Sequence, residues 1–183
     1  MNKDALFLSR KSPSLSTYDY SNVGYYFVTI CTRHRECFLG EIIKGAMSLN
    51  CVGQMVASLW TDIPRKFNQV MLDSFVVMPN HIHGIIILKE GISLSRVIQA
   101  FKSNSINEYI HGVNQKGWYK FDQTLWQRSF YDHVIRNEKD LLRIQEYILN
   151  NPLQWAMDDE NPNCRLAGKS KIAPTQGRPL RKY

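Results

Sequence analysis

The stretch "FVVMPNHIHGIIIL", from Phe75 to Leu88, contains two apolar runs joined by Pro79 and Asn80. β-Branched residues dominate both runs and a Pro-Asn pair favours a turn, so the stretch predicts two strands. The second run begins with His81 and His83, which project from one face because strand side chains alternate. Since an imidazole is costly to bury without a partner, we expect nearby groups to use both histidines.

Hydrophobic periodicity and turn residues predict further elements on both sides of this stretch. Before it we expect a strand over 25–32, a hairpin within 37–50 and a helix over 51–63 that Pro64 ends. After it we expect a helix over 93–110, a loop over 111–117, a strand over 125–135, and a helix that begins after Asn137 and closes at Pro152. This order predicts an α+β, ferredoxin-like (split βαβ) fold, in which an antiparallel sheet carries helices on one side.

The composition is typical of one globular domain, and the net charge favours a polyanionic partner. The chain has 183 residues, a formal charge of +7 and a pI near 9.3, which favours nucleic acid as a partner. It has neither a run of about 20 apolar residues nor a signal peptide, so we expect a cytoplasmic protein with no membrane association. The four cysteines lack C-x-x-C spacing, which argues against a zinc ribbon or a disulfide framework.

We expect three segments along the chain: a flexible lead-in over 1–23, a folded domain over 24–157 that holds the candidate site residues, and a tail over 158–183. Residues 164–183 include six basic residues and no acidic one. The tail is therefore interpreted either as an electrostatic arm for nucleic acid or as a solvated segment with no special role.

The histidine pair can be interpreted in two ways. His81 and His83 could both reach one metal ion, or they could be half-exposed histidines at the start of a strand. A metal site needs a third ligand, and Tyr147 and Asn151 share one face of the last helix because they lie four residues apart. If that face covers the histidines, a phenol and an amide oxygen converge on the metal.

The segments "VVMPNHIHGIIIL", "FKSNS" and "LWQRSFYDHVIRNEKDLLRIQEYILNNP" resemble single-tyrosine HUH transposases, in particular the REP-associated tyrosine transposases. The resemblance covers residues 24–155. It implies that His81 and His83, on a central strand, hold Mg²⁺ or Mn²⁺ and that Tyr147, on a C-terminal helix, is the nucleophile. Asn151 stands where the wider family usually has a glutamine as third metal ligand.

The resemblance also implies the reaction and its partner. Such enzymes nick and rejoin single-stranded DNA that carries a REP-like hairpin, through a tyrosine linked to the 5′ phosphate, and use no organic cofactor. We favour a monomer, with a dimer as the alternative. The basic residues that we expect near the DNA are Arg33, Arg35, Lys102, Arg128 and Arg136.

Alternatives remain at the level of residues and of function. Tyr131 is a rival nucleophile, whereas we expect His133 and Trp126 to be structural and Trp155 to cover the end of the last helix. The protein could also be a domesticated or inactive relative that only binds hairpin DNA. A metal hydrolase, in which the histidine pair activates water, is a third hypothesis.

Overall fold

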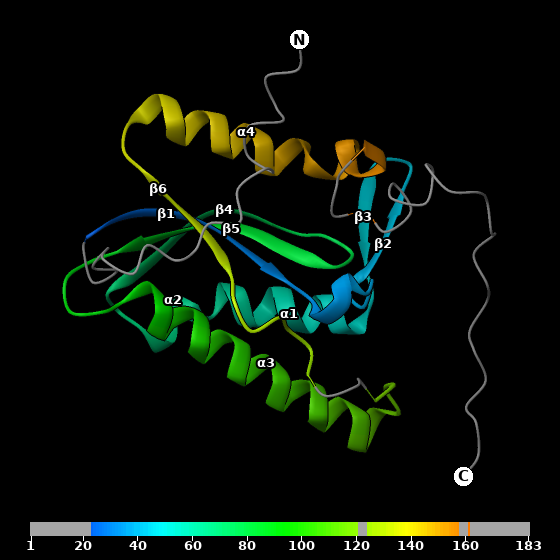
Figure 1. Ribbon diagram of the computed structural model, residues 1–183. Coiled ribbons are helices and arrows are strands. Elements are labelled where there is room, and N and C mark those ends of the chain that lie inside the picture. Colours follow the sequence, from blue (N-terminus) through cyan, green and yellow to red (C-terminus); the bar gives the residue numbers. More distant parts are fainter. Residues whose placement is uncertain (1–22, 121–123, 158–160, 162–183) are drawn as a thin grey trace.

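The computed structural model describes residues 23–120, 124–157 and 161, and its centre is a four-stranded antiparallel sheet (Figure 1). The strand order is β4-β5-β1-β6. These strands span Gly24–Cys31 (β1), Val70–Val77 (β4), His81–Leu88 (β5) and Tyr131–Ile135 (β6). The two strands predicted from the Phe75–Leu88 stretch are thus β4 and β5, and the histidine pair lies on a central strand.

Strand β5 forms the middle of the molecule because its residues are apolar on both faces. It pairs with β1 over their full lengths, from Gly24 opposite Leu88 to Cys31 opposite His81. Seven of the eight β5 residues are buried, which requires cover on both sides of the sheet.

Helices cover both faces of the sheet, so the expectation of helices on one side was wrong. Helices α1 (Cys51–Thr61) and α3 (Leu94–Lys116) lie on one face and α4 (Glu138–Gln154) lies on the other (Figure 1). The physical reason is the alternation along β5. Ile82 and Ile86 pack in the core beside α1 and α3, whereas Ile85 packs with Ile144 and Ile148 of α4.

Aromatic residues fill the larger of the two cores. Trp60 packs edge-on against Phe101, with ring centroids 5.3 Å apart, and lies directly on Gly84 of β5. Trp126 is 2% exposed and its indole donates a hydrogen bond to Ser105 at 2.7 Å, which confirms its predicted structural role. The absence of a side chain at Gly84 thus lets α1 approach the sheet closely.

The predicted hairpin before α1 is confirmed. It consists of β2 (Gly40–Ile43) and β3 (Ala46–Leu49), which pair only with each other. Lys44 and Gly45 form its turn with positive φ angles of 51° and 78°, as a tight two-residue hairpin requires. The short helix η2 (Arg33–Arg35) links β1 to this region.

Two prolines do not end helices where we expected. Helix α1 stops at Thr61, and Pro64 lies in the first turn of α2 (Ile63–Lys66), where a missing backbone N–H costs no hydrogen bond. Pro152 lies inside the last turn of α4, which continues to Gln154 and into η3 (Trp155–Met157). A proline this close to the end removes only one backbone donor.

Two other boundaries also differ from the prediction. The expected loop over 111–117 is helical as far as Lys116, and Gly117 then ends α3 in the left-handed conformation that favours glycine. The strand expected over 125–135 begins only at Tyr131, because Trp126 turns into the core and forms an isolated bridge with Thr32. Packing overrides local propensity at both places.

Most of the predicted lead-in and most of the predicted tail lie outside the described residues, so the three-segment division stays a prediction. The helices of the described part are all too short or too polar to cross a membrane.

Candidate active site

The histidine pair points into the space between the sheet and α4. The Nε2 atoms of His81 and His83 lie 3.0 Å apart, and both side chains are buried. Two cis ligands of an octahedral ion, each at about 2.1 Å, have donor atoms about 3.0 Å apart. The spacing of the two nitrogens therefore suits a divalent cation.

Each imidazole is held from behind through its Nδ1 atom. His83 Nδ1 lies 2.8 Å from the hydroxyl of Thr29, on the neighbouring strand β1. His81 Nδ1 lies 2.8 Å from Oδ1 of Asn80, whose own amide nitrogen donates to the carbonyl of Arg35 at 3.0 Å. These contacts leave the two Nε2 atoms facing one another.

Burial keeps both histidines neutral. It lowers the pKa of His83 to about 3. It also lowers the pKa of His81 well below its usual range, and repulsion from a protonated His83 and from the charge of Arg35 lowers it further. Neutral imidazoles have the free lone pair that a metal ligand needs.

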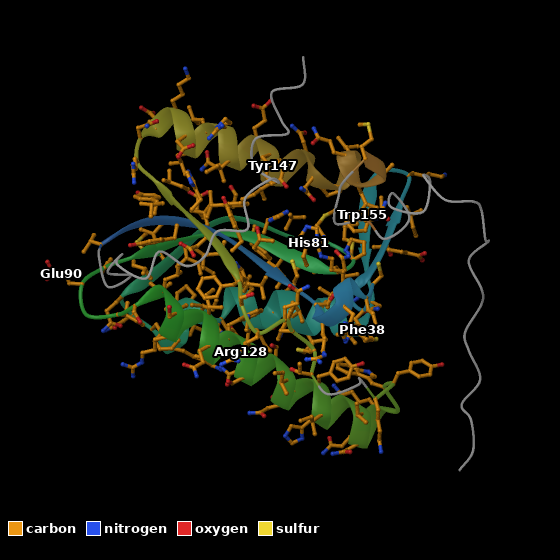
Figure 2. All side chains as sticks on the ribbon, in the orientation of Figure 1. Phe38, His81, Glu90, Arg128, Tyr147 and Trp155 are labelled. Atoms are coloured by element: carbon orange, nitrogen blue, oxygen red, sulfur yellow. The ribbon has the colours of Figure 1, made fainter. Side chains whose placement is uncertain are left out.

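Helix α4 and the adjoining turn η3 close the site through three residues spaced four positions apart: Tyr147 and Asn151 lie on α4, and Trp155 begins η3. Tyr147 Oη is 3.3 Å from His83 Nε2, and the Trp155 ring lies 5.9 Å from the His81 ring between centroids. Figure 2 shows Tyr147 on α4 and His81 on the sheet below it. Asn151 lies between Tyr147 and Trp155 on the same face and therefore faces the histidines.

The amide of Asn151 is the candidate for a third donor. Its side chain is 2% exposed and its Oδ1 atom has no hydrogen-bond partner among the described residues. A buried acceptor without a partner is costly, and a cation would satisfy it. The part of the chain that the structure describes has no cluster of three His, Cys, Asp or Glu that could hold a metal, so a site here needs a ligand such as this amide.

The five predicted DNA-binding residues are dispersed. Arg35 lies close enough to His81 for its charge to affect that histidine, and Arg33 donates to His34 at 3.2 Å. Arg128 lies beside α3, across the sheet from Tyr147 (Figure 2), and Arg136 is exposed between β6 and α4.

Lys102 has a second use that we did not predict from the sequence. Its ammonium donates to the backbone carbonyls of Gln127, Arg128 and Ser129 at 2.9–3.3 Å, and burial lowers its pKa to about 8. It therefore holds the irregular segment before β6 against α3. Its contact with DNA stays a prediction.

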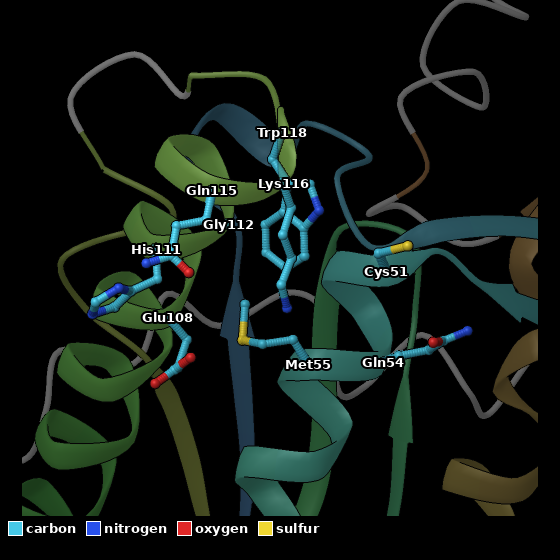
Figure 3. A pocket seen from close by; sticks show the side chains of 9 residues that line it. All are labelled: Cys51, Gln54, Met55, Glu108, His111, Gly112, Gln115, Lys116 and Trp118. Carbon is cyan, nitrogen blue, oxygen red and sulfur yellow. The ribbon is translucent and has the colours of Figure 1, made fainter.

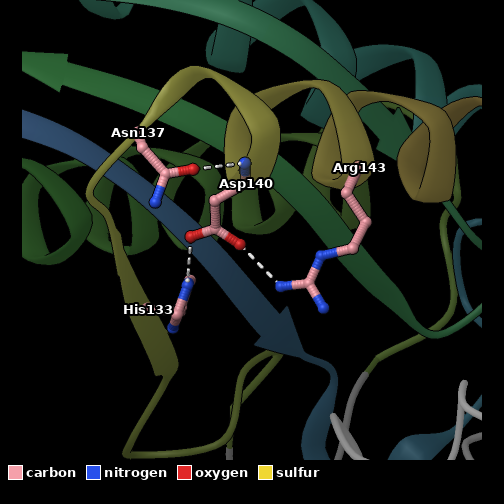
Figure 4. Close-up of polar contacts among 4 residues, drawn as sticks. All are labelled: His133, Asn137, Asp140 and Arg143. Atoms are coloured by element: carbon pink, nitrogen blue, oxygen red, sulfur yellow. Dashed lines mark hydrogen bonds and ion pairs between the residues drawn. The ribbon is translucent and has the colours of Figure 1, made fainter.

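His133 is a structural histidine, as we expected. Its Nε2 atom lies 2.8 Å from Asp140 of α4, and Arg143 contacts the other oxygen of that carboxylate at 2.6 Å (Figure 4). Tyr131, the rival nucleophile, lies two strands from His83: it pairs with Thr29, which pairs with His83. The phenolic oxygen of Tyr147, in contrast, lies 3.3 Å from His83 Nε2.

A separate cavity of about 730 Å³ lies between α1 and α3 (Figure 3). Its lining includes Met55, His111 and Trp118. Because α1 and α3 cover the face of the sheet opposite to α4, the sheet separates this cavity from the histidine pair.

The proteins that this chain is similar to identify its family. Residues 19–151 match the family described as "Transposase IS200 like". The chain belongs to the IS200-like transposase family. A relative from Haemophilus influenzae (strain Rd), described as an uncharacterized protein, is 40% identical over 166 residues, and the match covers 81% of this chain and 91% of that protein.

Two further relatives support the resemblance to REP-associated tyrosine transposases. The REP-associated tyrosine transposase of Escherichia coli K12 is 27% identical over 136 residues, covering 74% of this chain and 70% of its own length. A solved structure of a REP-associated tyrosine transposase bound to a REP hairpin has a TM-score of 0.55 and 25% identity, and the match covers 75% of this chain and 71% of that one. The predicted subgroup and the α+β fold are confirmed.

The sequence did not reveal the groups behind the histidines. Asn80 was interpreted only as a turn residue, although its place directly before His81 was a usable signal. Thr29 gave no signal, because it is 54 residues from His83 and only strand pairing brings them together.

Proposed function

We propose that this IS200-like transposase nicks and rejoins single-stranded hairpin DNA through a covalent 5′-phosphotyrosine on Tyr147. The observation that carries the proposal is the contact of 3.3 Å between Tyr147 Oη and His83 Nε2, on a histidine already paired with His81. The REP-associated relatives support the choice of a REP-like hairpin as the substrate.

We assign the metal to His81, His83 and Asn151. Their donors are two neutral imidazole nitrogens and one amide oxygen, which leave the charge of the cation uncompensated by protein. The resemblance to HUH transposases, and not the donor set, is what favours Mg²⁺ or Mn²⁺ as the ion. When bound, the ion would polarise the scissile phosphate and offset the charge that develops on its oxygens.

Tyr147 carries the bond exchange. Its phenolic oxygen loses a proton and attacks phosphorus, the bond from phosphorus to the 3′ oxygen breaks, and that oxygen takes up a proton as a 3′ hydroxyl. One phosphate ester replaces another, so the bond energy is retained for rejoining. Attack by a second 3′ hydroxyl reverses the step and releases Tyr147.

We infer that the basic side chains support this reaction by binding the DNA backbone. Arg35 is the best placed of the five candidates because its backbone carbonyl contacts Asn80, the residue before His81. Arg33, Lys102, Arg128 and Arg136 would contact DNA further from the histidines. We further propose that the protein acts in the cytoplasm as a monomer.

The test uses end-labelled single-stranded hairpin DNA from the genomic flanks of the gene, incubated with the full chain and Mn²⁺. Denaturing electrophoresis and peptide mass mapping should show a DNA adduct on Tyr147. Tyr147→Phe should lose the adduct. Tyr131→Phe removes an equivalent phenolic hydroxyl two strands from His83 and should retain the adduct. Chelation with EDTA should abolish cleavage and spare much of the hairpin binding.

Each other outcome favours a different hypothesis. An adduct on Tyr131 would overturn the choice of nucleophile. Specific binding without an adduct under any metal would indicate an inactive DNA-binding relative, and cleavage without an adduct would indicate a hydrolase. Cleavage that survives thorough chelation would contradict the metal role of His81 and His83.

A further inference from the structure

The side chain of Asn80 joins two groups that have opposite hydrogen-bonding requirements. It is 1% exposed, and its amide nitrogen donates to the backbone carbonyl of Arg35 at 3.0 Å. A carbonyl can only accept, so the amide cannot be turned round without placing two oxygens in contact. Its oxygen must therefore face Nδ1 of His81, at 2.8 Å.

An oxygen that only accepts needs a proton on the nitrogen opposite it. We infer that Asn80 is a positioning residue that places the proton of His81 on Nδ1 and so leaves the Nε2 lone pair directed into the site. Neutral imidazole in water favours the other tautomer, with the proton on Nε2, which cannot bind a metal through that atom. The inference rests on the proposed function in so far as Nε2 is the metal ligand.

Thr29 does not impose the same choice on His83. Its hydroxyl lies 2.8 Å from Nδ1, and a hydroxyl can either donate or accept. His83 can therefore adopt either tautomer beside Thr29, whereas His81 has one. The two histidines look equivalent in the sequence, but only His81 has its tautomer set by a neighbouring amide.

The backbone around Asn80 explains why its amide is held so firmly. The Asn80 carbonyl accepts from both the backbone nitrogen and the hydroxyl of Thr32, at 2.8 and 3.0 Å. The acceptor of its amide, Arg35, has a φ angle of 57°, a conformation that a residue with a side chain rarely adopts. The Asn80 amide thus donates to a carbonyl in a constrained turn, which holds the acceptor in place.

The experiment measures the tautomer directly, on the full chain labelled with ¹⁵N, by long-range proton–nitrogen correlation spectra of the histidine rings. Wild type and Thr29→Val, the matched control on the other histidine, should both show His81 with its proton on Nδ1. Asn80→Ala should show the Nε2–H tautomer of His81. Calorimetric titration should show Mn²⁺ affinity about 10- to 100-fold lower for Asn80→Ala than for wild type.

Asn80→Asp separates the tautomer from the turn. It keeps an acceptor opposite Nδ1 but sets a second oxygen against the Arg35 carbonyl, so the turn must shift while the Nδ1–H tautomer should be retained. This variant remains informative if Asn80→Ala fails to fold. The inference is overturned if wild type carries the proton on Nε2, if Asn80→Asp loses the Nδ1–H tautomer, or if a folded Asn80→Ala binds Mn²⁺ like wild type. These spectra need neither DNA nor metal, so a failure to cleave DNA would not be mistaken for a failure of this inference.

Discussion

The two histidines can be buried in an apolar strand because their ring nitrogens have partners. His81 contacts Asn80 through Nδ1, His83 contacts Thr29 through Nδ1, and the two Nε2 atoms contact each other. Burying a polar group costs free energy unless it is hydrogen-bonded. These contacts therefore explain why β5 tolerates both imidazoles. They also favour a specific site over two histidines that are neighbours by chance.

Gly84, one residue after His83, offers a residue-scale test of the packing behind the site. A Cβ atom there would lie 2.4 Å from Cζ2 of Trp60 and 3.2 Å from Cβ of Phe75. Gly84→Ala should lower the free energy of unfolding by about 1–3 kcal/mol, since a crowded core must shift to admit a methyl group. Urea denaturation measures the change.

Gly24→Ala is the matched control for this substitution. It lies at the start of β1, where the nearest atom to a new Cβ would be 3.6 Å away, an ordinary contact. We expect a change within about 0.5 kcal/mol. An equal loss in both variants would show that strand glycines, and not the contact with Trp60, determine the effect.

Helix α4 spans the sheet and is fixed to both of its edge strands. On β6, His133 contacts Asp140, and on β4, Asp73 accepts a hydrogen bond from Gln145 at 2.8 Å. Burial raises the pKa of Asp73, but hydrogen bonds from Gln145 and Ser74 outweigh it and lower the pKa overall. Tyr147 lies two residues after Gln145, so these edge contacts set its position over His83.

Asp140 gives an element-scale prediction with a pH dependence. Burial raises the pKa of this carboxyl, but hydrogen bonds and charge from His133 and Arg143 outweigh it, so its pKa in the folded chain lies below the usual value. A lowered carboxyl pKa stabilises the fold above the unfolded pKa of about 3.9, and this stabilisation is lost as the pH falls through the folded pKa.

Asp140→Asn should therefore lower the free energy of unfolding by up to about 1 kcal/mol at pH 7, because the contacts are partly exposed. The difference from wild type should shrink as the pH falls below 4. Urea denaturation at pH 7 and pH 3 tests this, with Glu138→Gln as a control that removes a charge from the same helical turn. A difference that stays constant between the two pH values would contradict the role of the Asp140 charge.

At the scale of the whole molecule, the sheet separates two surfaces. The candidate active site lies under α4, and the cavity between α1 and α3 lies on the opposite face. The formal charge of +7 belongs to the whole chain, and residues 165–183, which lie outside the described part, contribute six basic residues and no acidic one. Their removal takes the formal charge from +7 to +1.

Deleting residues 165–183 should weaken binding to hairpin DNA and flatten its dependence on salt, because fewer phosphates would be neutralised. Fluorescence anisotropy over a range of salt concentrations measures both effects. A chain of full length with the six basic residues changed to glutamine should behave like the deletion. Unchanged or tighter binding would favour a bystander or an inhibitory tail.

The sequence by itself determined the α+β class, most element centres, the shared face of His81 and His83, and the shared face of Tyr147 and Asn151. These features depend on periods of 2 and 3.6 residues, which neighbouring side chains encode. Only the tertiary structure decided that α4 covers the opposite face from α1 and α3, that Thr29 supports His83 across 54 residues, and that Lys102 holds three carbonyls. Such contacts depend on strand order and packing between distant segments, and no local pattern specifies them.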